Sequence, residues 1–159
     1  MRNTWPFVVA LCERMEQNGI VVWLAGGWAE ERHGLCAPRP HGDVDLLYPA
    51  TDFAALDALF AADPTFTAIA AKRFSHKRAA LLEDVMIEWL LVVPTSIGFQ
   101  THYFDGAVVL SWPADTFADT ATAPRLVSTT TLQFYRAQHP RIAQAYTNYS
   151  TIVSLVQRP

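Results

Sequence analysis

The fold of this chain is decided by the stretch Ile20-Val21-Val22-Trp23-Leu24-Ala25-Gly26-Gly27-Trp28 and by Asp43-Val44-Asp45-Leu46, which follows it closely. Residues two apart in a strand point to the same face, so Asp43 and Asp45 would present their carboxylates together. Two carboxylates at this spacing repel each other unless a cation lies between them, and Mg²⁺ is a typical cation for oxygen ligands. Glycines upstream allow the backbone to approach a phosphate closely. The stretch therefore predicts a site for phosphate and metal.

The composition sets the class of protein. The chain has 159 residues, of which 51% are apolar and 17% charged, which predicts a folded single unit rather than disorder. A formal net charge of −3 argues against general nucleic-acid binding through a basic surface. No apolar run approaches the roughly 20 residues of a membrane helix. Cys12 and Cys36 lack metal-ligand spacing, so a reducing, cytoplasmic location is expected.

Hydrophobic periodicity predicts an α+β fold, a mixed β-sheet flanked by helices with a short C-terminal helical region. We expect residues 1–127 to form the main domain and residues 128–159 to form the helical region, packed on it as one compact unit. Expected helices cover residues 5–18, 28–33 and 51–63, and another follows a cap within residues 128–131. Expected strands cover residues 20–25, 43–48, 74–82, 85–93, 108–110 and 126–127.

The strand expected at residues 85–93 contains a third candidate carboxylate. Glu88 is the only charged residue in this otherwise apolar run. A lone carboxylate inside a central strand costs several kcal/mol unless it is paired, protonated or bound to metal. If this strand lies beside residues 43–48, Glu88 completes a cluster with Asp43 and Asp45. Three acids can hold two Mg²⁺ ions, one activating a hydroxyl and one binding a triphosphate.

The motif Gly26-Gly27-Trp28-Ala29, followed by Arg39-Pro40-His41-Gly42-Asp43-Val44-Asp45-Leu46, resembles the signature of the DNA polymerase β-like nucleotidyltransferases. Within that superfamily it is most similar to the small aminoglycoside and lincosamide nucleotidyltransferases. The resemblance covers roughly residues 23–49, and the strand with Glu88 fits more loosely. It implies an enzyme of the adenylyltransferase type, in which an acceptor hydroxyl attacks the α-phosphate of a nucleoside triphosphate, expected to be ATP, and pyrophosphate leaves.

The resemblance also implies the roles of individual residues. Asp43, Asp45 and Glu88 would be the catalytic and metal-binding carboxylates for two Mg²⁺ ions, with Glu88 as general base. Four further positions would bind the nucleotide: Gly26, Gly27, Arg39 and His41. Arg39 could instead pair with a nearby acid, and His41 could instead brace the acidic loop.

Two questions remain open at the level of sequence: the acceptor, and the surface that binds it. The expected acceptor is a hydroxyl of an antibiotic-like small molecule. The alternatives are an antitoxin-type domain that modifies or binds a partner protein, and a nucleotide-binding module without turnover. An acidic cleft would favour a cationic aminoglycoside and could involve Glu30, Glu31, Glu83 and Asp84. The densest basic cluster is interpreted as a solvated face, with a contact to triphosphate or to an acidic partner as the alternative; its members are Lys72, Arg73, Lys77 and Arg78.

Overall fold

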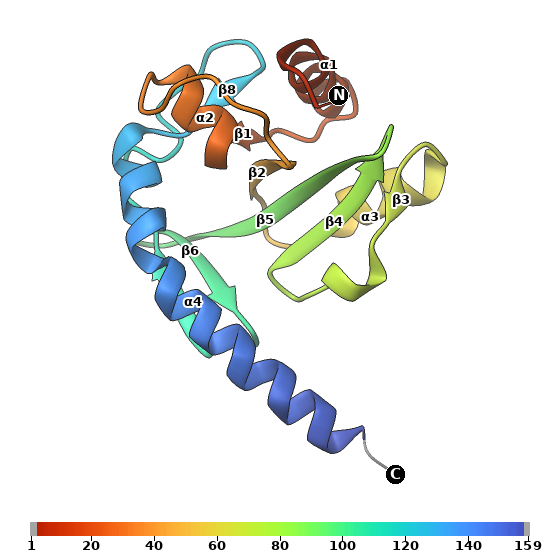
Figure 1. Cartoon of the computed structure of the whole chain (residues 1–159), viewed down its shortest axis with the longest axis vertical. Coiled ribbons are helices and arrows are strands. Elements are labelled where there is room, and N and C mark those ends of the chain that lie inside the picture. The colour runs from red at the N-terminus through yellow and green to blue at the C-terminus, as the bar shows by residue number, and fades with distance from the viewer. Residues whose placement is uncertain (1–2, 158–159) are drawn as a thin grey trace.

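A computed structural model describes residues 3–157 and has the predicted α+β architecture, a mixed sheet with helices on both sides (Figure 1). Its helices are α1 (Trp5–Gln17), α2 (Gly26–Arg32), α3 (Ala54–Ala62), the 3₁₀ turn η1 (Ala70–Lys72) and α4 (Thr129–Val156). Its strands are β1 (Trp23–Leu24), β2 (Asp43–Pro49), β3 (Thr67–Ala68), β4 (Lys77–Leu82), β5 (Val85–Thr95), β6 (Gly98–Tyr103), β7 (Val108–Ser111) and β8 (Arg125–Leu126).

The sheet places the two predicted acidic strands side by side at its centre. The strand order is β3-β4-β5-β2-β1-β8, and β6 with β7 extends from the end of β5. β2 and β5 run parallel, whereas β4 and β5 are antiparallel and joined by a tight turn at Glu83 and Asp84. Glu88 therefore lies on a strand next to residues 43–48, as the predicted cluster of three carboxylates requires.

The core lies on the face of the sheet opposite these acids. Alternation along β2 and β5 turns Val44, Leu46, Ile87 and Trp89 inward, and each is at most 1% exposed. Phe60 of α3 packs edge-on against Trp89, with ring centroids 5.3 Å apart. Burial of these side chains leaves Asp45 and Glu88 on the other face, towards α4.

Some predicted boundaries differ from the structure. The strand expected at residues 20–25 is only β1, because only Trp23 and Leu24 pair with neighbouring strands. The helix expected from Trp28 begins two residues earlier, at Gly26. The strand expected from Phe74 begins at Lys77, because Phe74 and Lys77 pair with each other in a tight turn.

Two strands, β3 and β6, and the 3₁₀ turn η1 were not predicted. Pro94 ends the expected strand, since proline lacks an N–H group, yet β5 continues through it to Thr95 and pairs with β6 there. β3 and η1 are too short to show a hydrophobic period. β8 covers Arg125 and Leu126, one residue from the expected position.

α4 is a single helix of 28 residues that continues through Pro140. The predicted cap is confirmed, since the hydroxyl of Ser128 accepts a hydrogen bond from the N–H of Thr131 at 3.0 Å. Helix α4 packs against α2 and β7, and its C-terminal end extends past the sheet (Figure 1). Among residues 3–157, no helix combines the length and the apolarity that crossing a bilayer requires.

Candidate functional site

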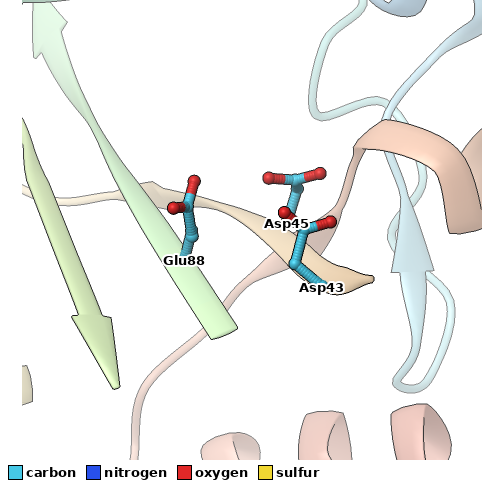
Figure 2. Close-up of side chains that lie close together, drawn as sticks. All are labelled: Asp43, Asp45 and Glu88. Carbon is cyan, nitrogen blue, oxygen red and sulfur yellow. The ribbon is translucent and has the colours of Figure 1, made fainter. Parts of the chain in front are cut away.

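Three carboxylates meet on the face of the sheet towards α4. The parallel register of β2 and β5 places Asp45 directly beside Glu88, and Asp43 lies two residues earlier on the same face. Asp43, Asp45 and Glu88 each offer one oxygen, and these oxygens lie within 4.8 Å of one another. Figure 2 shows the three side chains rising from β2 and β5 in the same direction. The alternation that predicted the pair also brings in the third carboxylate.

The donor set of this cluster suits a hard divalent cation. All three ligand groups are carboxylates, and their oxygens are close enough to share one ion. Burial, and after it the negative charges of Asp43 and Glu88, raise the pKa of Asp45 to about 7. Repulsion of this kind is what a bound cation would relieve, because it offsets the excess negative charge. The residues therefore fit Mg²⁺.

The two glycines of the motif make room for side chains of the site itself. Gly26 has φ of +60°, and a Cβ atom built there would lie 2.1 Å from Oδ2 of Asp45. A Cβ atom on Gly27 would lie 2.7 Å from Nδ1 of His41. The sequence explained both glycines by the approach of a phosphate. The structure adds a second reason: a side chain at Gly26 would collide with Asp45, and one at Gly27 would collide with His41.

His41 braces the loop before Asp43. Its Nε2 lies 2.8 Å from Oε2 of Glu31, and its ring packs on Trp28 with centroids 4.2 Å apart. This arrangement supports the bracing interpretation of His41, although the ring also lies next to Gly27.

Asn3 is a positioning residue that the sequence did not reveal. Its Nδ2 donates to the carbonyl oxygens of His41 at 2.9 Å and Asp43 at 3.1 Å. Its Oδ1 accepts a hydrogen bond from the indole N–H of Trp28 at 3.0 Å. The pattern before α1 indicated only a helix cap at Asn3 or Thr4, and the cap is Thr4. A contact between residues 38 positions apart leaves no local signal.

Glu88 has two lysine partners in this structure. Oε1 of Glu88 accepts a hydrogen bond from Nζ of Lys72 at 2.5 Å, and Oε2 forms an ion pair with Lys77. Burial acts to raise the pKa of Glu88, but the hydrogen bonds from Lys72 and Lys77 outweigh it, so the pKa is lowered. The predicted basic cluster is thus divided. Lys72 and Lys77 belong to the site, whereas Arg73 and Arg78 bind Asp57.

Two pockets adjoin the carboxylates, and Asp45, Glu88 and Tyr135 line both. The glycine pocket has a volume of about 440 Å³ and is also lined by Gly26, Gly27, Arg39, Arg136 and His139. The aromatic pocket has a volume of about 350 Å³ and is also lined by Phe74, His76, Tyr103, Phe104 and Tyr146. The carboxylates therefore lie where two cavities of different chemistry meet.

Arginine side chains surround a partly buried acid in the glycine pocket. Nη2 of Arg39 lies 3.5 Å from Oε2 of Glu30, and Arg136 of α4 pairs with the other carboxylate oxygen. Arg39 therefore pairs with an acid, one of its two predicted roles, while still lining the pocket. The sequence did not indicate this contact of Arg136, because Arg136 lies 106 residues from Glu30 and only folding brings the two together.

The four acids that could contribute to an acidic cleft do not line one pocket together. Of these, only Glu30 lines either pocket, and it is paired with arginines. Glu31 binds His41, while Glu83 and Asp84 form the turn at the opposite end of β4 from Lys77. Neither Glu83 nor Asp84 lines a pocket that adjoins the carboxylates.

Comparison with known structures identifies the fold as that of the nucleotidyltransferases. The lincosamide antibiotic adenylyltransferase LnuA, solved with lincomycin bound, aligns with a TM-score of 0.68 at 13% identity, over 96% of this chain and 99% of that chain. ANT(2'')-Ia in complex with adenylyl-2''-tobramycin aligns with a TM-score of 0.56 at 16% identity, over 92% of this chain and 86% of that chain.

A third structure shares the fold. A Thermotoga maritima protein, provisionally described as a nucleotidyltransferase, aligns with a TM-score of 0.53 at 14% identity, over 94% of this chain and 95% of that chain. No protein-family model and no curated protein sequence matches the chain. The nucleotidyltransferase fold, most like that of antibiotic nucleotidyltransferases, is therefore established by three-dimensional similarity.

Proposed function

We propose that this chain is a Mg²⁺-dependent nucleotidyltransferase that moves a nucleoside monophosphate from a nucleoside triphosphate to a hydroxyl of a small-molecule acceptor. The observation that carries the proposal is the pair of pockets with the three carboxylates between them. A reaction between two substrates needs two cavities that open onto one catalytic cluster. Two of the similar structures are a lincosamide antibiotic adenylyltransferase and ANT(2'')-Ia with adenylyl-2''-tobramycin, which supports an antibiotic-like acceptor and ATP as the nucleotide.

The glycine pocket is assigned to the nucleotide. It combines the close backbone approach at Gly26 and Gly27 with the positive charges of Arg39 and Arg136. Glycine backbone and guanidinium groups are suited to binding phosphate oxygens. In this assignment Arg39 and Arg136 exchange part of their interaction with Glu30 for the triphosphate. His41 contributes by holding the loop that carries Asp43.

Asp43 and Asp45 would hold Mg²⁺, with Glu88 as the third carboxylate. Bound Mg²⁺ would supply charge neutralisation at the phosphates and polarise the reacting oxygens. The aromatic pocket holds the acceptor, so that its hydroxyl oxygen reaches the α-phosphorus from the side opposite the glycine pocket. A bond forms between that oxygen and the α-phosphorus, and the bond to the bridging oxygen of the β-phosphate breaks. Glu88 takes the hydroxyl proton, and pyrophosphate leaves with the displaced bridging oxygen.

The experiment is a screen for pyrophosphate release from each of the four nucleoside triphosphates with Mg²⁺, across hydroxyl-bearing antibiotics and other small molecules. Use of an α-³²P-labelled nucleotide shows whether the label moves to the acceptor. We expect transfer with at least one acceptor and its loss on chelation of Mg²⁺. Absence of transfer with every acceptor, combined with ordinary binding of Mg²⁺-nucleotide, would refute the enzymatic proposal and favour a binding module.

Three matched variants control the screen. Asp43→Asn and Asp45→Asn each remove one charge from the cluster, and Asp115→Asn makes the same change at an exposed position after β7. Transfer should be lost in the first two and kept in the third. A cytoplasmic location remains a prediction that fractionation of the source cells can check.

A further inference from the structure

The aromatic pocket has a wall of rings on the far side of the carboxylates from Gly26. The ring of His76 lies at its centre, with centroid distances of 4.7 Å to Tyr103 and 4.7 Å to Phe104. Tyr146 of α4 closes the outer side and packs 5.7 Å from Phe104. Faces and edges of aromatic rings bind the apolar surface of ring-shaped ligands, including aryl groups and the C–H faces of sugars.

This wall carries little charge. Burial lowers the pKa of His76 to about 4, so its imidazole is neutral at pH 7, and Nδ1 accepts a hydrogen bond from the N–H of Phe104. The charged residues of the pocket lie at its end by the cluster. There Lys72 and Lys77 form ion pairs with Glu88. Asp45 is the other carboxylate that lines the pocket. A ligand with several positive charges would meet two ammonium groups at that end.

One polar group at the pocket lacks a partner. Tyr103 is 3% exposed, and its hydroxyl makes no hydrogen bond within residues 3–157. The hydroxyl of Tyr135 lies near enough to shift the pKa of Tyr103, although it does not satisfy the Tyr103 hydroxyl as a hydrogen-bond partner. A buried hydroxyl without a partner costs about 1–3 kcal/mol, which a ligand can recover by supplying an acceptor or donor. Burial raises the pKa of both Tyr103 and Tyr135, so both hydroxyls stay protonated and can donate hydrogen bonds.

We propose that the aromatic pocket selects an uncharged, ring-bearing acceptor, and that Tyr103 and Tyr135 bind its polar substituents beside the reacting hydroxyl. The inference rests on the proposed function and narrows its acceptor to one chemical class. Tyr103 is a specificity-determining residue, because its hydroxyl gains a hydrogen-bond partner only when the acceptor substrate is bound. Polycationic acceptors are disfavoured, because Lys72 and Lys77 face them and the neutral wall supplies no compensating acid.

The test measures acceptor binding by calorimetry, on the full chain with Mg²⁺ and the non-hydrolysable analogue α,β-methylene ATP present. The uncharged probes are 4-nitrophenyl glycosides, which combine an aryl ring with several hydroxyls, and the polycationic probe is tobramycin. We expect at least one glycoside to bind and tobramycin not to displace it. Tyr103→Phe should weaken glycoside binding about three- to tenfold, the value of one hydrogen bond.

Control measurements distinguish failure of this inference about the acceptor from failure of the proposed function. Tyr48→Phe removes a hydroxyl from another largely buried tyrosine, one that does not line the aromatic pocket, and should leave glycoside binding unchanged. The melting temperature of Tyr103→Phe should be at least that of wild type, since its hydroxyl has no partner to lose. Tighter binding of tobramycin than of every glycoside, or no glycoside binding while Mg²⁺-nucleotide still binds, overturns the inference alone. Failure of Mg²⁺-nucleotide to bind overturns the proposed function as well.

Discussion

At the scale of single residues, the site depends on charge that the protein cannot balance by itself. Asp45 lies beside Asp43 and Glu88, and the lysines near it are engaged by Glu88. Removing one charge from such a cluster relieves repulsion in the absence of metal and removes a ligand in its presence. Structural and functional effects of a substitution should therefore have opposite signs.

Asp45→Asn is the sharpest case of this kind. In EDTA its melting temperature should equal or exceed that of wild type, because an uncompensated carboxylate is replaced by a neutral amide. Mg²⁺ should raise the melting temperature of wild type but not that of the variant, since binding to the folded state alone stabilises it. Transfer activity should fall by on the order of a hundredfold or more. Differential scanning fluorimetry with and without Mg²⁺ measures the first two effects, and an Mg²⁺-dependent shift retained in Asp45→Asn would contradict the metal assignment.

Gly26→Ala tests whether the glycine protects the position of Asp45. Two effects combine there, a positive φ of +60° and a clash with the Asp45 carboxylate. Gly34→Ala is the matched control, because Gly34 has φ of +70° but nothing within 4 Å of its Cβ position. Both variants should lose about 1–2 kcal/mol of stability through backbone strain. Only Gly26→Ala should also lose turnover, on the order of a hundredfold, because displacement of about 1 Å suffices for that loss. Equal turnover of the two variants would show that the clash has no functional consequence.

At the scale of elements, the site depends on how the loop before β2 is held. Asn3, which lies just before α1, joins this loop to α2 through hydrogen bonds to His41, Asp43 and Trp28. His41 adds its own link to Glu31 of α2. The position of Asp43 therefore depends on a segment forty residues earlier in the chain.

Asn3→Ala removes all three of these hydrogen bonds. We expect a loss of about 1–3 kcal/mol in unfolding free energy, because buried carbonyl oxygens lose their donor. A weaker affinity for Mg²⁺ should accompany it, since Asp43 is no longer held in place. Thr4→Ala is the control, because Thr4 caps α1 without a side-chain hydrogen bond. Denaturant unfolding and Mg²⁺ titration measure the two effects, and an Mg²⁺ affinity identical to wild type would contradict the positioning role.

Prediction from sequence succeeded where an element has a strong period and failed where contacts span the chain. Alternation at Asp43 and Asp45, and the single charge of Glu88 in an apolar run, predicted that these three carboxylates lie together, as the structure shows. Tyr103 and Tyr135 were missed, since aromatic residues are more often core than ligand-binding and only the fold brings β6 and α4 together. The pairing of Glu88 with Lys72 and Lys77 was not predicted, because the basic cluster was interpreted as a solvated face.

At the scale of the whole molecule, buried His76 makes stability depend on pH. Its pKa is about 4 in the folded state against an ordinary value of 6.5, with burial as the main cause, Lys77 lowering it further and Asp105 opposing. The unfolded state therefore binds more protons between these values, so stability present above pH 6.5 is lost as the pH falls to 4. The loss should be on the order of 3 kcal/mol.

His76→Gln supplies the control for this pH dependence. Glutamine can accept the hydrogen bond from the N–H of Phe104 but does not titrate. Subtracting the variant's unfolding free energy from that of wild type at each pH removes the contribution of the carboxylates. The difference should decline between pH 6.5 and 4, and a constant difference across that range would contradict the account.

The central claim is that Asp43 and Asp45 bind the metal that holds the nucleotide. Isothermal titration calorimetry of ATP, with Mg²⁺ or with EDTA, tests it directly on wild type, on the Asp43→Asn, Asp45→Asn double variant and on Asp115→Asn. We predict that Mg²⁺ tightens ATP binding at least about tenfold in wild type and in Asp115→Asn, and that the double variant loses this gain. Binding of Mg²⁺-ATP by the double variant with the affinity of wild type would contradict the claim.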